Sequence, residues 1–104
     1  MNYCVSYLTC KDEKEARKIA DALLKKRLIA CSKFVPISCR YWWQDKITDG
    51  KEILMIMETR QDLFSEIEKI VSELHSYETF VLETLPIENI SVKAKTWLKT
   101  ELAS

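Results

Sequence analysis

Glycine and proline are scarce in this sequence, which has one glycine and two prolines among 104 residues. Glycine-rich phosphate-binding loops are therefore not expected, and the connections between elements should be short. A surplus of charge is also lacking, since 16 lysines and arginines balance 16 aspartates and glutamates. Because a nucleic-acid-binding protein needs basic surplus to displace counterions from phosphates, we expect no nucleic-acid partner.

Targeting and redox signals are equally sparse. No apolar run approaches the ~20 residues that span a bilayer, and no charged segment followed by an apolar stretch indicates a secretory signal. We therefore expect a cytoplasmic protein with no membrane partner. The four cysteines contain no Cys-x-x-Cys pair, which argues against a zinc knuckle or a thioredoxin-type site. In a reducing compartment all four should be free thiols.

The residue patterns that are present predict one domain, residues 1–104, with alternating strands and helices. Strands are expected at residues 3–9, 30–43, 51–57 and 80–85, with helices beginning near residues 12, 59 and 91. Asp12 with Glu15, and Thr59 with Asp62, have the spacing of capping boxes at helix starts, and Asp49-Gly50 predicts the turn of a long hairpin. This order is the ferredoxin-like βαββαβ motif, an α+β fold with an antiparallel sheet and an extra C-terminal helix.

The third predicted strand has a pattern that bears on assembly. Ile53 to Met57 is apolar at five consecutive positions, which indicates that both of its faces are buried. Two helices of this motif cover only one face of the sheet, and the short terminal helix cannot cover the other. We therefore expect another copy of the chain to cover it.

Five segments, in order along nearly the whole chain, form a recognisable set: Leu28-Ile29-Ala30-Cys31, Tyr41-Trp42-Trp43-Gln44-Asp45-Lys46-Ile47, Leu74-His75-Ser76-Tyr77-Glu78, Leu85-Pro86-Ile87 and Trp97-Leu98. Together they resemble the CutA family of divalent-cation tolerance proteins. The resemblance implies a cytoplasmic homotrimer with a role in the response to metal ions. Since the sequence contains no nucleophile elbow and no His-Glu-x-x-His motif, we expect no enzymatic activity.

The chain departs from the family pattern at positions that matter for metal binding. Ser76 and Phe80 replace prolines of the family's histidine-containing stretch. Val81 stands where the family commonly has a glutamate implicated in metal contact, and Leu8 stands where some members have a cysteine associated with copper. Two ligands that the resemblance would imply are therefore missing.

His75, the only histidine, is the centre of the metal hypothesis. Glu78, Glu83 and Cys10 are its candidate partners, and imidazole, thiolate and carboxylate together suit copper or zinc. The prediction is weak, exchangeable binding of a divalent cation, with copper preferred, and no organic cofactor. Two alternatives stay open: His75 could simply end the second helix, and the protein could be a small-ligand or protein-interaction module similar to the PII proteins.

Overall fold

The computed structural model describes residues 2–104, so Met1 of the predicted domain lies outside the described residues. The chain alternates strands and helices, with a short 3-10 turn (Gln61–Leu63) before the second helix. Its elements are β1 (Tyr3–Cys10), α1 (Glu13–Lys25), β2 (Cys31–Trp43), β3 (Lys46–Arg60), α2 (Phe64–Leu74), β4 (Leu82–Pro86) and α3 (Val92–Glu101).

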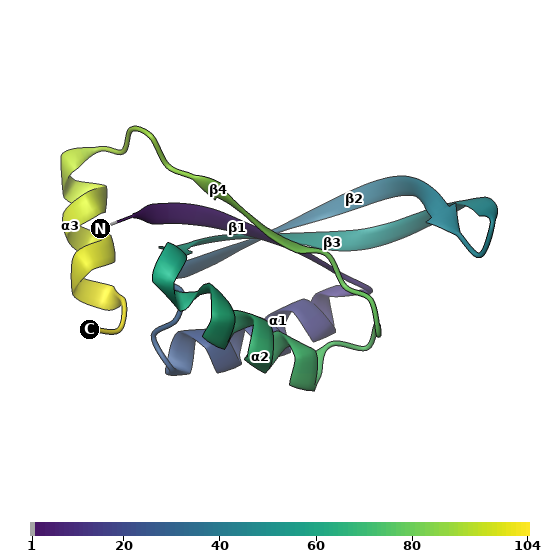
Figure 1. Cartoon of the computed structure of the whole chain (residues 1–104), viewed down its shortest axis with the longest axis horizontal. Helices are drawn as coiled ribbons and strands as arrows, with labels where there is room; N and C mark the ends of the chain where they lie inside the picture. Colours follow the sequence, from purple (N-terminus) through teal and green to yellow (C-terminus); the bar gives the residue numbers. More distant parts are fainter. Residues whose placement is uncertain (1) are drawn as a thin grey trace.

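The strands form one antiparallel sheet in the order β2-β3-β1-β4. Helices α1 and α2 lie together on one face of it, while α3 stands across the end of the sheet near the N-terminus (Figure 1). This arrangement confirms the predicted α+β, ferredoxin-like fold with an additional C-terminal helix. The β2–β3 hairpin projects beyond the helices and stretches the chain to 45 × 27 × 21 Å (Figure 1).

The hairpin turns at a different place from the predicted one. Gln44 and Asp45 form the turn, and their φ angles of 48° and 62° lie in the left-handed region. Gly50 lies inside β3 instead. A Cβ atom there would lie 3.4 Å from Cys39 Sγ and Tyr41 Cε1, at the short end of ordinary van der Waals contact. The prediction of a turn at Asp49-Gly50 is therefore wrong, because both residues pair with β2 within the ladder, Asp49 with Arg40 and Gly50 with Cys39.

Two further boundaries differ from the predictions. Thr59 does not cap a helix: it is a buried residue of β3 whose hydroxyl donates to the carbonyl of Leu28 at 2.6 Å. Helix α2 begins only at Phe64, and Asp62 pairs with Arg60 at 2.6 Å rather than completing a capping box. The fourth strand begins at Leu82 rather than residue 80, and it includes Pro86, which an edge strand tolerates.

The sheet has two unlike faces. The helix face, which α1 and α2 cover, carries Leu8 of β1 and Met55 and Met57 of β3, all fully buried. The open face is the opposite side and carries their alternating neighbours, among them Tyr7 and Ile56, which pair across β1 and β3 and are only half-buried. The third strand was expected to be buried on both sides. Within one chain, only its helix face is fully buried.

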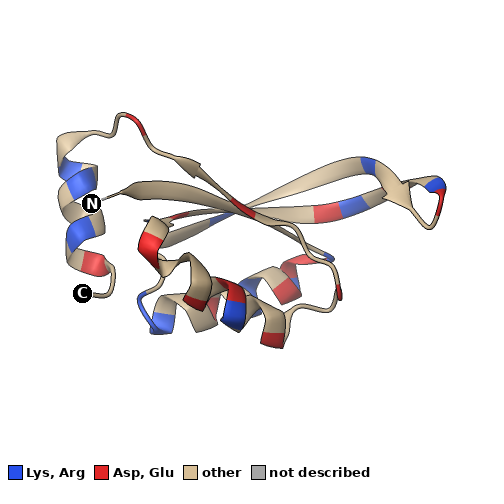
Figure 2. Cartoon of the chain, in the orientation of Figure 1, with Lys and Arg blue, Asp and Glu red and all other residues tan. Residues whose placement is uncertain are grey.

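Helix α3 closes one end of the sheet. Leu98 and Leu102 are buried in the core, and the N–H of Ala103 donates to the carbonyl of Arg27 at 2.8 Å. Charged residues cluster along the three helices, whereas long stretches of the sheet have few (Figure 2). Among residues 2–104, no helix combines the length and the apolar character that crossing a membrane requires. All four cysteines are free, as predicted.

Candidate functional site

His75 ends α2, and its side chain is completely buried. Its backbone N–H donates to the carbonyl of Val71 at 2.8 Å, so it serves as the C-cap, as one of the two interpretations of the sequence proposed. Its Nε2 lies 2.8 Å from the carbonyl oxygen of Thr9, which can only accept, so Nε2 carries the proton. Nδ1 accepts the N–H of Tyr77 at 3.0 Å. These two bonds specify a neutral imidazole.

Cys10 and Glu15 lie beside this imidazole. Their ligand atoms and those of His75 all lie within 4.8 Å of one another, with 4.0 Å between His75 Nδ1 and Glu15 Oε1. We call these three residues the buried triad. Cys10 ends β1, Glu15 lies in the first turn of α1 and His75 follows α2, so three separate elements converge on one point below the sheet.

The structure brings together two of the four residues that the sequence suggested as ligands. Cys10 and His75 belong to the buried triad. Glu78 and Glu83 do not, because both side chains are exposed and Glu83 pairs with Tyr7 on the open face. Their role as ligands stays a prediction.

Sequence reasoning missed Glu15 as a potential ligand. It was expected only to complete a capping box with Asp12, and the N–H of Glu15 does donate to Asp12 Oδ1 at 2.9 Å. Its carboxylate also accepts the N–H groups of Lys11, at 3.1 Å, and Ser76, at 2.8 Å. The Ser76 contact spans 61 positions, and no local pattern could have signalled it.

The protonation states of the buried triad follow from these surroundings. Burial, reinforced by the carboxylates of Glu15 and Glu52, raises the pKa of the Cys10 thiol to about 12, so the thiol is protonated at neutral pH. Its Sγ–H donates to Met55 Sδ at 3.6 Å. Burial alone would raise the pKa of Glu15, but hydrogen bonds from Ser76 and Lys11 outweigh it and lower that pKa. Glu15 is therefore a carboxylate.

The buried triad fits a copper or zinc ion in the types and spacing of its donors. Each donor is nevertheless engaged in a hydrogen bond. A metal ion would have to displace the Tyr77 N–H from His75 Nδ1 and the proton from Cys10. The site can thus receive a cation only at the expense of contacts that stabilise the protein without one.

A separate hollow of about 430 Å³ lies at the start of α1. Its walls are residues 11–13, 36–38 of β2 and 51–53 of β3. Lys11 and Lys51 face three carboxylates there, Asp12, Glu13 and Glu52, so the hollow carries charge of both signs.

Comparisons with known proteins agree with this architecture. Residues 4–101 match the family described as CutA1 divalent ion tolerance protein. The chain is 34% identical over 97 residues to the divalent-cation tolerance protein CutA of Pyrococcus horikoshii, covering 93% of this chain and 95% of that protein. It is 40% identical over 82 residues to its counterpart in Archaeoglobus fulgidus, covering 79% and 80%. The structure described as the periplasmic divalent cation tolerance protein CutA from Archaeoglobus fulgidus superposes with a TM-score of 0.92 and 34% identity, covering 95% and 97% of the two chains.

Proposed function

The chain belongs to the family of CutA1 divalent ion tolerance proteins, and from this premise we propose that it acts in the tolerance of divalent cations. In this proposal it is a cytoplasmic homotrimer that responds to metal ions by binding them rather than by catalysing a reaction. The observation that carries the proposal is the buried triad, in which thiol, carboxylate and imidazole converge within 4.8 Å in a protein of this family.

Binding of a divalent cation at the buried triad should be weak and exchangeable. The ion gains up to three ligands, but it must break the bond between Tyr77 N–H and His75 Nδ1 and displace a proton held with a pKa of about 12. Copper(II) should bind more tightly than zinc(II), as the general order of affinities predicts.

Calorimetric titration tests this part of the proposal. Copper(II) should bind the wild-type protein with higher affinity than the His75→Ala variant, while zinc(II) should bind both more weakly. Because His75 also ends α2, circular dichroism must first show that the variant retains its helices. Identical copper isotherms for the two folded proteins would leave His75 with a structural role alone.

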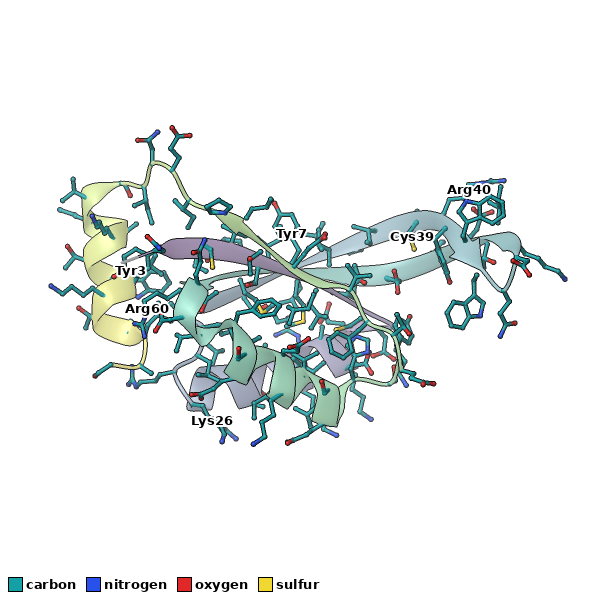
Figure 3. The ribbon with its side chains drawn as sticks, in the orientation of Figure 1. Tyr3, Tyr7, Lys26, Cys39, Arg40 and Arg60 are labelled. Carbon is teal, nitrogen blue, oxygen red and sulfur yellow. The ribbon has the colours of Figure 1, made fainter. Side chains whose placement is uncertain are left out.

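The open face supports assembly into a homotrimer. Tyr7, Leu54 and Ile56 are half-buried there. Helices α1 and α2 lie on the opposite face of the sheet (Figure 1). The projecting hairpin, on which Figure 3 labels Cys39 and Arg40, ends in Trp42 and Trp43, which are 72% and 54% exposed. Apolar surface of this extent favours burial against another protein surface, and a further copy of the chain is the partner we propose.

A small-ligand module is the second candidate function, and the hollow at the start of α1 favours it. About 430 Å³ is enough for a small metabolite, and two lysines beside three carboxylates suit a ligand that carries charges of both signs. Titration with metal ions separates the candidates, since this alternative requires no metal. A metabolite that binds in the absence of cations and loses affinity on Lys11→Met would favour it.

A further inference from the structure

We propose that Met55 completes the buried triad as a copper site that prefers copper(I) to zinc(II). The proposal rests on the proposed function, because it names the ion and the ligands through which this protein would respond to metal. Met55 Sδ lies 3.6 Å from Cys10 Sγ, and both side chains are fully buried. A thioether thus lies next to the thiol of the buried triad, out of contact with water.

Two sulfur donors decide which metal this site favours. Thiolate and thioether are soft ligands that suit copper(I), whereas zinc(II) in proteins takes thiolate, imidazole and carboxylate and gains little from methionine. Cys10 and Met55 supply one sulfur of each kind. Because Met55 comes from β3 and Cys10 from β1, the sheet itself fixes their separation.

The hydrogen bond that orients the His75 ring is the kind found at metal-bound histidines in other proteins. Such a histidine usually donates its second ring N–H to a carbonyl or a carboxylate, which orients the ring. His75 makes this bond through Nε2–H to the carbonyl of Thr9. The remaining nitrogen, Nδ1, lies 4.0 Å from Glu15 Oε1, on the side of the carboxylate.

Only one hydrogen bond blocks Nδ1, and its donor lies in an irregular segment. Tyr77 N–H reaches Nδ1 from residues 75–81, which belong to no helix or strand between α2 and β4. Freeing the lone pair requires only that the Tyr77 N–H turn away from Nδ1, a change that breaks no hydrogen bond of the sheet. The Tyr77 N–H then needs another acceptor, which water entering with the ion supplies.

Loading of the site involves no change of oxidation state. Copper(I) forms a bond to Cys10 Sγ as the S–H bond breaks, and the proton leaves to solvent. Dative bonds from Met55 Sδ and His75 Nδ1 complete a three-ligand set, and the Cys10 thiolate neutralises the single positive charge of copper(I). The Glu15 carboxylate keeps its hydrogen bonds from the N–H groups of Lys11 and Ser76. The loaded site therefore releases one proton for each copper(I) bound.

Matched methionine variants test the proposal. Anaerobic competition with bicinchoninate measures the affinity for copper(I), and Met55→Leu replaces the thioether with a side chain of similar volume. We expect Met55→Leu to weaken copper(I) binding by at least about 10-fold, and Cys10→Ser by at least about 100-fold. Losing a ligand should cost no less than losing a group that only hydrogen-bonds to a ligand, which costs about 10–100-fold. The affinity for zinc(II) should stay unchanged in Met55→Leu.

Met57→Leu is the control, since Met57 is equally buried on the same face of the same strand but is not a proposed ligand. Copper X-ray absorption provides a second measurement on the same proteins: it should show two sulfur neighbours in the wild type and one in Met55→Leu. Equal copper(I) affinities for Met55→Leu and Met57→Leu, or one sulfur neighbour in the wild type, would overturn the proposal. If copper(II) binding still depended on His75, the proposed function would survive that outcome.

Discussion

The two faces of the sheet are made by the same strands, yet they reach very different degrees of burial. On β1 and β3 the pair Leu8 and Met55 is fully buried beneath α1 and α2, whereas the neighbouring pair, Tyr7 and Ile56, is half-buried on the open face. One face is completed within the chain, and we infer that the other is completed by further copies. Apolar residues on a single strand can therefore serve folding at one position and assembly at the next.

A charge placed on the helix face should destabilise the folded protein more than any other change considered below. Met57 is fully buried, so Met57→Lys would leave an unpaired ammonium group in the core. The loss of several kcal/mol is comparable to the whole stability of a domain, about 5–15 kcal/mol. Far-ultraviolet circular dichroism at 25 °C should show an unfolded or aggregated chain. A native spectrum with a cooperative melt would contradict the assignment of this face to the core.

The same charge placed one residue earlier should act on assembly. Ile56 lies on the open face opposite Lys33, so Ile56→Lys adds a like charge beside an existing one. We expect this variant to abolish the soluble trimer, which gel filtration measures, rather than to lower its melting temperature slightly. Ser65→Lys, an exposed change on α2, is the control and should leave the assembly intact. A soluble Ile56→Lys trimer would contradict the inference that the open face is buried in the assembly.

Replacing Glu15, which lies on the helix side of the sheet, should lower the stability by an intermediate amount that depends on pH. Its pKa is lowered in the folded protein, so its stabilising contribution is complete above the ordinary carboxyl value of 4.5 and is lost as pH falls through the folded-state value. Glu15→Gln should cost about 1–3 kcal/mol at neutral pH, because two backbone N–H groups lose a charged acceptor.

Urea unfolding at a fixed protein concentration, at pH 7 and at pH 3, measures this prediction. The difference in stability between wild type and Glu15→Gln should shrink at the lower pH. A difference that is the same at both values would show that the charge of Glu15 contributes nothing.

The smallest change in stability is expected for a substitution on the outer surface of α1. Arg17 Nε lies 2.9 Å from Glu13 Oε2, but both side chains are about 60% exposed. Glu13→Gln should change the free energy of unfolding by less than about 0.5 kcal/mol, and added salt should reduce the change further. A loss above 1 kcal/mol in the same urea experiment would mean that this surface, too, is covered in the assembly.

Much of the fold could be predicted because its signals are local. Apolar periodicity located both central helices, and the β-branched and aromatic runs located the strands. The hairpin turn could not be placed in this way, because Gln44 and Asp45 adopt left-handed conformations without being glycine. The one glycine, Gly50, lies inside β3 instead, where it pairs with Cys39 of β2.

The candidate site could be predicted only in part, because some of its contacts join residues that are far apart in the sequence. His75 and Cys10 stood out by residue type. Glu15 and Met55 join them through contacts between α1, β1, β3 and the segment after α2, and these depend on the register of the sheet. Residue types suggest donors, but only tertiary packing decides which donors meet.

The molar mass of the wild-type protein in solution tests the central inference most directly. If the open face is completed by further copies, multi-angle light scattering at micromolar concentration should give the mass of three 12.2-kDa chains. The mass should not fall on dilution across that range, because large apolar interfaces make folding and assembly inseparable. A folded chain with the mass of one 12.2-kDa subunit would contradict the account.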